Sequence, residues 1–152
     1  MSPLCPMPEV DAEPRTWPGL TLLAATVLLE AEGESDVGKL AVAWVIRNRM
    51  DQKRLGVHAI VLAPWQFSAF NGDYAHIRRS RLRDAKEQMW EACWRAGCAA
   101  YWRLIPDPSQ GASNYLNVPL TRTLRGGDLP DWFDDSKVVA EIGQHTFLRL
   151  VG

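Results

Sequence analysis

The chain has 152 residues, of which 47% are hydrophobic and 23% charged, and 17 Lys and Arg against 18 Asp and Glu give a formal net charge of −1. This length and composition predict one compact domain and exclude a disordered chain. Because the near-neutral charge gives no general attraction for polyanions and no uncharged stretch approaches the roughly 20 residues that span a bilayer, we expect neither nucleic-acid binding nor stable membrane insertion.

The N-terminal segment, residues 1–18, is rich in proline and has no hydrophobic period, which predicts an extended arm, or a strap over the domain, ahead of a folded domain over residues 19–152. This segment lacks the basic region and the apolar core of a classical export signal. Three cysteines, Cys5, Cys93 and Cys98, predict neither a disulfide framework nor a zinc site. We therefore expect no metal and no cofactor, and we expect Cys93 and Cys98 to pack as small apolar side chains.

Helical signals dominate the first two thirds of the chain. Apolar spacing predicts a helix over residues 20–31 ended by Gly33, a second helix from Glu34 or Ser35 to about Met50, a helical turn over 56–62, and a long amphipathic helix over 80–102. Beyond residue 103, frequent Pro, Gly, Asn and Asp leave residues 111–118 and 145–151 as the strand candidates, paired antiparallel. The predicted fold class is α+β, a helix-rich single domain with a small antiparallel β element near the C-terminus.

Three carboxylates, Glu30, Glu32 and Glu34, follow the first predicted helix. A carboxyl on the last turn of a packed helix is unusual, because this end of the helix carries partial negative charge. That field and partial burial would raise the pKa of Glu30, as a general acid near neutral pH requires. The alternatives are a solvated Glu30 at a helix end, and a Glu34 that complements the positive N-terminus of the next helix.

Residues 64–72 form an aromatic segment without helical or strand period. Sugar rings bind to aromatic faces flanked by amide and hydroxyl partners, which in this segment are Trp65, Phe67, Gln66, Ser68 and Asn71. On composition alone, a loop pinned to the core by its aromatic rings fits equally well. Of the seven Trp residues, we expect four in the core, namely Trp44, Trp90, Trp94 and Trp132.

A third group of polar residues joins the two predicted strands, with Tyr115 on the first and His145 on the second. A histidine on a short strand is more often structural than catalytic. The basic run from Arg78 to Lys86 predicts a solvated helix face, and its alternative is a contact with an anionic polymer.

Taken together, these groups resemble the SleB-like, spore cortex-lytic type of cell wall hydrolase, a family found also in phage lysis proteins. The family's opening motif, approximately E-A-x-G-E and then G-x-x-A-V-A-x-V-x-x-N-R, is similar to EAEGE at residues 30–34 and GKLAVAWVIRNR at 38–49. Its later segments are similar to QFSAFN at 66–71, GASNYLN at 111–117, PDW at 130–132 and IGQHTF at 142–147. The resemblance runs in order from about residue 22 to 149.

The resemblance implies a lysozyme-like catalytic domain that cleaves peptidoglycan between N-acetylmuramic acid and N-acetylglucosamine, with Glu30 as the catalytic acid. It implies substrate-binding roles for Glu34, Gln66, Phe67, Ser68, Asn71, Tyr115 and His145. Glu32 stands where the family usually has Arg, so a more negative field would raise the pKa of Glu30 further if Glu32 faces the cleft. The missing export signal and wall-binding domain favour a monomeric phage endolysin, made in the cytoplasm and acting on the cell wall in the host periplasm.

Glycoside cleavage needs an acid for the leaving oxygen and a group that attacks the oxocarbenium-like carbon. Relatives in this family resemble lytic transglycosylases, in which one Glu serves as acid and then as base while the sugar's own C6 hydroxyl attacks. A hydrolytic muramidase, with Glu34 or Asp36 assisting water, is the close alternative. A non-catalytic peptidoglycan-binding or virion module using the same cleft is the alternative from another class.

Overall fold

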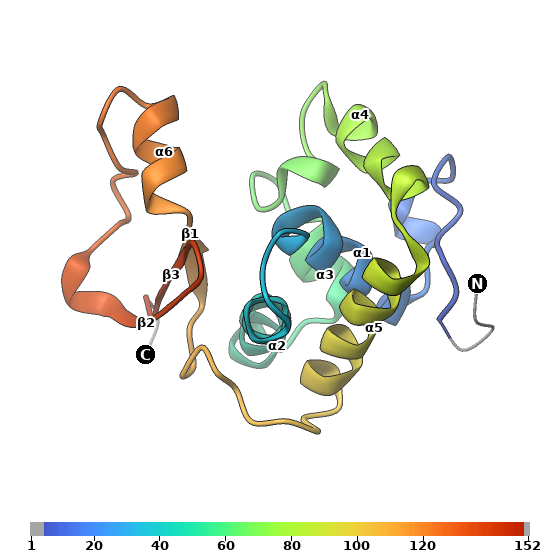
Figure 1. Cartoon of the computed structure of the whole chain (residues 1–152), viewed down its shortest axis with the longest axis horizontal. Helices are drawn as coiled ribbons and strands as arrows, with labels where there is room; N and C mark the ends of the chain where they lie inside the picture. The colour runs from blue at the N-terminus through green and yellow to red at the C-terminus, as the bar shows by residue number, and fades with distance from the viewer. Residues whose placement is uncertain (1–4, 151–152) are drawn as a thin grey trace.

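The computed structural model describes residues 5–150, and its centre is a group of helices built on α1 (Gly19–Ala31). α1 is buried on nearly every side and packs against α2 (Asp36–Lys53), α3 (Val57–Val61) and α5 (Glu87–Tyr101). Figure 1 shows these helices close together, with the strands and α6 set apart on the other side of α2. The α1 helix therefore fixes the position of the residues at its C-terminal end.

The boundary between α1 and α2 lies close to the predicted one, and the side chain of Ser35 caps α2 as expected. Gly33 does not adopt the left-handed conformation expected of a helix-ending glycine. The buried Lys39 takes over part of that role, because its Nζ donates hydrogen bonds to the backbone oxygens of Glu32 and Glu34. These bonds satisfy carbonyl groups that the end of a helix leaves without partners.

The single long helix predicted over residues 80–102 is wrong. The chain forms α4 (Ala75–Ser80), a 3-10 turn (Arg81–Asp84) and then α5, and the backbone is extended at Ala85 and Lys86. Leu82 in the turn is fully buried in the helical core. Its spacing from the apolar residues of α5 imitates one continuous helical period, although the chain changes direction between them.

Three strands form an antiparallel sheet in the order β1-β3-β2, namely β1 (Asn114–Leu116), β2 (Val138–Ile142) and β3 (His145–Leu148). The predicted antiparallel pairing is confirmed, and Tyr115 of β1 lies opposite Phe147 of β3. The helix-rich α+β class is confirmed as well. Neither β2 nor α6 (Val118–Leu124) was predicted from the sequence, and α6 buries none of its residues and so shows no apolar period.

The N-terminal arm, described from residue 5, lies against the helical core and contains a 3-10 turn (Pro14–Thr16). Two indole groups hold it: Trp17 Nε1 donates to the backbone oxygen of Glu9 at 3.0 Å, and Trp90 Nε1 donates to that of Cys5 at 2.8 Å. Two more 3-10 turns cover Ser68–Phe70 and Asp135–Lys137. No helix within residues 5–150 is both long and apolar enough to cross a bilayer.

Candidate active site

A cleft of about 1040 Å³ lies between the helical core and the sheet. One wall comes from the end of α1, from Arg49 of α2 and from the loop over residues 65–72, and the other comes from β1, α6 and β3. The cleft brings together most of the site residues predicted from the sequence, namely Glu30, Gln66, Phe67, Ser68, Asn71, Tyr115 and His145.

Glu30, on the last turn of α1, is the only carboxylic acid among the described residues that line this cleft. Its burial raises the pKa of the Glu30 carboxyl above the usual value, and this effect exceeds the opposing effects of its neighbours. Those neighbours are Tyr115, whose hydroxyl donates a hydrogen bond to the carboxyl, and the positive charges of Arg49 and Arg81. A carboxyl with a raised pKa keeps its proton at higher pH, as a general acid needs.

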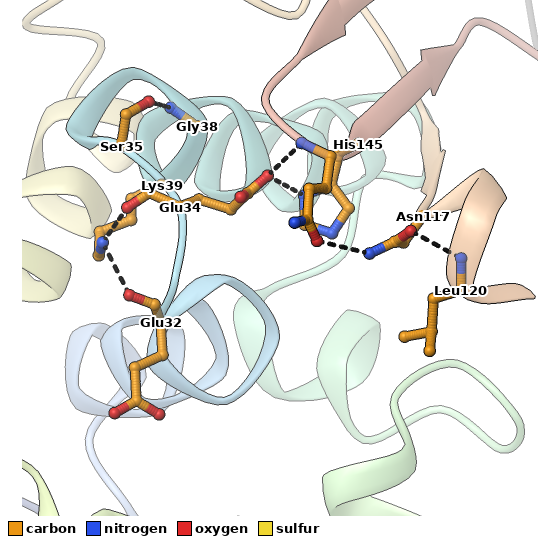
Figure 2. Close-up of polar contacts among 9 residues, drawn as sticks. Glu32, Glu34, Ser35, Gly38, Lys39, Asn117, Leu120 and His145 are labelled. Carbon is orange, nitrogen blue, oxygen red and sulfur yellow. Dashed lines mark hydrogen bonds and ion pairs between the residues drawn. The ribbon is translucent and has the colours of Figure 1, made fainter.

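The Glu32 carboxylate does not line the cleft, and it forms an ion pair with Arg81 at 2.9 Å. Glu32 was expected to raise the pKa of Glu30 further if its side chain faced the cleft. Because it does not face the cleft, this expectation does not apply. Burial of Glu30 is the principal cause of that rise, and Glu32 is not among its causes. In Figure 2 the Glu32 side chain points away from the β2–β3 turn and from His145.

Tyr115 is placed by the pairing of β1 with β3, which sets its ring beside the ring of His145, with 4.9 Å between the centroids. Burial raises the pKa of Tyr115 well above its usual value, and the negative charge of Glu30 acts in the same direction. Tyr115 is therefore a neutral hydrogen-bond donor to Glu30 over the whole physiological range.

Arg49 was quoted in the sequence motif but not proposed as a site residue. Its Nε donates to the backbone oxygen of Ser113 at 2.6 Å, its Nη1 donates to Gln66 Oε1 at 3.2 Å, and its guanidinium lies 5.4 Å from the centre of the Phe67 ring. Burial lowers the pKa of Arg49, and the neighbouring Tyr115 and Glu30 partly offset this effect. Arg49 thus ties the helical core to the β1 segment and brings a positive charge near Glu30.

The aromatic loop divides its residues between the core and the cleft. Phe67 is 2% exposed and belongs to the helical core, so it pins the loop, whereas Trp65 is 92% exposed and lines the cleft. Asn71 Nδ2 donates to the backbone oxygens of Phe67 in the loop and of Ala63 just before it, and so stabilises the shape of the loop. Phe67 therefore fits the interpretation of a loop pinned to the core, and Trp65 presents an open aromatic face to the cleft.

Trp132 was predicted to be in the core, and this prediction is wrong: its side chain is 41% exposed and lines the cleft. Trp132 lies in the irregular segment between α6 and β2, over residues 125–137, where no residue is buried. Asn117 and Leu120 at the start of α6 also line this wall, and neither was predicted as a site residue because the sequence does not indicate a helix there.

Glu34 does not line the cleft. Its carboxylate contacts the β2–β3 turn, where Oε1 accepts a hydrogen bond from the backbone N–H of Gln144 at 3.0 Å and lies 3.3 Å from His145 Nδ1 (Figure 2). Burial lowers the pKa of His145, and the Glu34 carboxylate partly opposes this. His145 is consequently a neutral imidazole near pH 7.

The basic run from Arg78 to Lys86 makes contacts within the chain rather than presenting a continuous charged face. Arg78 and Arg79 donate to backbone oxygens of the aromatic loop, Arg81 pairs with Glu32, and Arg83 pairs with Asp11. These contacts favour the structural interpretation of the run.

The cysteines Cys5, Cys93 and Cys98 are free thiols. Burial raises the pKa of the Cys93 thiol to about 12, which makes it a poor nucleophile. No three His, Cys, Asp or Glu side chains within residues 5–150 gather closely enough to hold a metal ion.

A comparison with protein-family models matches residues 33–148 to a family described as Cell Wall Hydrolase. The match covers more than half of the chain, includes the aromatic loop and all three strands, and begins three residues after Glu30. No curated protein and no solved structure matches the chain.

Proposed function

Because the chain belongs to the cell wall hydrolase family, we propose that it cleaves the glycan strand of peptidoglycan between N-acetylmuramic acid and N-acetylglucosamine, with Glu30 as general acid and base. The observation that carries this proposal is the position of Glu30, the only carboxylic acid lining the described cleft, with a pKa raised by burial. A glycoside hydrolase of the usual two-carboxylate kind would need a second acidic side chain in the same cleft.

In the proposed reaction, Glu30 gives its proton to the glycosidic oxygen as the bond from this oxygen to C1 of the muramic acid breaks. The Glu30 carboxylate then accepts the proton of the C6 hydroxyl of the same sugar, and that oxygen bonds to C1. The product is a 1,6-anhydro sugar, no water is consumed, and Glu30 is protonated again. Arg49 and the Tyr115 hydroxyl stabilise the carboxylate between the two proton transfers.

The cleft offers the surfaces that a glycan strand needs. Trp65 and Trp132 supply exposed aromatic faces for the C–H sides of sugar rings, while Gln66, Ser68 and Asn114 supply amide and hydroxyl groups at the same cleft. The cleft volume of about 1040 Å³ is at the upper end of ligand sites, as expected for several residues of a polymer.

Purified sacculi test this proposal when their loss of turbidity is followed with the wild-type protein, with Glu30→Gln, and with Glu141→Gln as the matched control. Glu141 is an exposed carboxylate on β2 that does not line the cleft. We expect lysis by the wild type and the control and none by Glu30→Gln, because the amide keeps the shape and removes the proton. Equal lysis by all three would remove Glu30 from its role, and lysis by none would favour a non-catalytic wall-binding module.

A further inference from the structure

Glu34 lies outside the cleft, yet its carboxylate is held in a defined place at the junction of the helical core and the sheet. We propose that Glu34 is a positioning residue: it clamps the β2–β3 turn to the segment that ends α1, so that His145 and Tyr115 keep the Tyr115 hydroxyl on the Glu30 carboxyl. This inference rests on the proposed function of Glu30. It replaces the substrate-binding role expected for Glu34 with one that acts through other side chains.

The helical end of the clamp is rigid. Lys39, which is 4% exposed, donates from Nζ to the backbone oxygens of both Glu32 and Glu34 (Figure 2). The loop between α1 and α2 is thereby fixed to α2 only a few residues after Glu30. Glu34 and Glu30 thus belong to one stretch of chain whose shape a buried ammonium group holds.

The sheet end of the clamp requires glycine. Gly143 has a left-handed φ of 58°, and a Cβ built on it would lie 2.7 Å from Glu34 Oε1. A side chain at residue 143 would therefore both strain the turn and expel the Glu34 carboxylate. Similarly, a Cβ on Gly38 would lie 2.9 Å from Glu34 Cβ. The absence of a side chain at Gly38 and at Gly143 therefore provides the space that the Glu34 side chain occupies.

From the turn, the contacts lead back into the active site. Glu34 Oε1 lies 3.3 Å from His145 Nδ1. The His145 ring packs against the Tyr115 ring with 4.9 Å between centroids and 60° between the ring planes. The Tyr115 hydroxyl in turn donates to Glu30. Tyr115 is also fixed through its register with Phe147. Without the Glu34 contact, the Gln144 backbone N–H loses its hydrogen bond to the helical core and the His145 ring loses its neighbour at Nδ1. The packing of Phe147 on α2 remains, so we expect a small shift of the His145 ring, and of the Tyr115 ring against it, rather than an opening of the sheet.

Several charged and titratable groups face Glu30, so the test must separate Tyr115 from the others. Tyr115 comes from β1, Arg49 from α2 and Arg81 from the turn before α5, and each of them lowers the pKa of Glu30. Only Tyr115 also contacts His145, the residue that Glu34 touches. An effect of Glu34 on Glu30 that disappears when Tyr115 is replaced therefore identifies the path.

The experiment measures the pKa of Glu30 by NMR of ¹³C-carboxyl-labelled glutamate in the wild type, Glu34→Ala, Tyr115→Phe and the double variant. The Glu30 signal is assigned by its loss in Glu30→Gln, and Glu141→Ala is the control. Removing the Tyr115 hydroxyl raises the pKa of Glu30, because a donor to the carboxylate is lost. We expect Glu34→Ala to raise it by at least half as much and the double variant to raise it no further than Tyr115→Phe does. Glu34→Gln, whose side-chain oxygen still accepts from Gln144, should restore most of the wild-type value.

Binding to sacculi is measured in parallel, in the Glu30→Gln background so that no substrate is consumed. We expect unchanged affinity after Glu34→Ala, since Glu34 does not touch the cleft. An unshifted Glu30 pKa in folded Glu34→Ala, additive shifts in the double variant, or a loss of sacculus affinity would each overturn the inference. The NMR titration needs no catalysis, so its result stands apart from the turbidity assay that decides whether Glu30 is the acid.

Discussion

At the scale of single residues, Glu30 connects chemistry with stability. A carboxyl whose pKa is raised on folding binds its proton more tightly in the folded state than in the unfolded chain. Below the unfolded pKa of about 4.5, Glu30 is protonated in both states and does not lower the free energy of unfolding. As the pH rises from there through the folded pKa, Glu30 lowers the free energy of unfolding progressively. The proposed acid is therefore held at a cost to the folded state.

The unfavourable effect of the Glu30 carboxylate on stability at neutral pH leads to a prediction for Glu30→Gln. The amide carries no charge at any pH and its oxygen still accepts the Tyr115 hydrogen bond, so the variant should have a higher Tm than the wild type at pH 7. The difference should narrow as the pH falls toward 4. Thermal unfolding followed by circular dichroism at a series of pH values measures this, and a variant less stable at pH 7 would contradict the burial of a raised-pKa carboxyl.

Trp65 and Phe67 are neighbours in the chain with opposite expected phenotypes. Trp65 is 92% exposed and has a left-handed φ of 65°, a conformation that costs a non-glycine residue on the order of 1 kcal/mol. Trp65→Gly should therefore leave the free energy of unfolding unchanged or raise it by that amount, while it weakens binding to sacculi.

Phe67→Ala should instead lower the free energy of unfolding by about 3 kcal/mol, because it empties a core position. Urea denaturation and sacculus co-sedimentation separate the two, and a marked loss of stability in Trp65→Gly would contradict the assignment of Trp65 to the cleft.

Some of these residues can be predicted from the sequence and others cannot, for physical reasons. Glu30 can be predicted because a carboxyl on the last turn of an apolar helix is electrostatically unfavourable, which can be recognised without knowledge of the fold. Arg49 and Trp132 acquire their place only through contacts with chain segments far away, such as the bond from Arg49 to Ser113. Composition and spacing cannot distinguish an indole on a cleft wall from one in the core.

At the scale of elements, the helices with long apolar runs were predictable and the one with no buried side chain was not. α1 and α2 have such runs, α2 is also capped by Ser35, and their bounds lie near the predicted ones. The break between α4 and α5 depends on extended backbone at Ala85 and Lys86, where neither Pro nor Gly marks it. α6 depends on its N-cap Asn117, because it has no buried face.

The cap of α6 gives a prediction at this scale. Asn117 Oδ1 accepts from the backbone N–H of Leu120 at 3.0 Å, and its Nδ2 donates to Gln144 Oε1 at 3.1 Å. Asn117→Ala should destabilise α6 by about 1 kcal/mol, because the cap is lost and no packing compensates. Amide hydrogen exchange should be faster over Val118–Leu124 and unchanged in α1. Asn117→Asp, which keeps an acceptor for Leu120, is the matched control and should restore most of the protection.

At the scale of the whole molecule, a helical core and a small sheet face each other across the cleft. A second apolar cluster joins them, in which Val42 and Val45 of α2 pack against Phe147 of β3. Asn48 and Arg49 of α2 donate to the backbone oxygens of Ala112 and Ser113, and Glu34 holds the β2–β3 turn. The proposed acid, Glu30, comes from the helical core, and Tyr115, which donates to it, comes from the sheet. The geometry of the proposed reaction therefore depends on how the two parts are held together.

The central claim, that Glu30 alone serves as acid and base, is tested most directly by the mass of the products. Purified sacculi are digested with the wild-type protein, and the released fragments are analysed by mass spectrometry without prior reduction. Internal attack by the C6 hydroxyl predicts 1,6-anhydro ends, lighter by one water than reducing ends, and predicts that digestion in ¹⁸O-labelled water adds no label to them. Fragments with reducing ends that carry ¹⁸O would contradict the claim, because water and not the C6 hydroxyl would then have attacked C1.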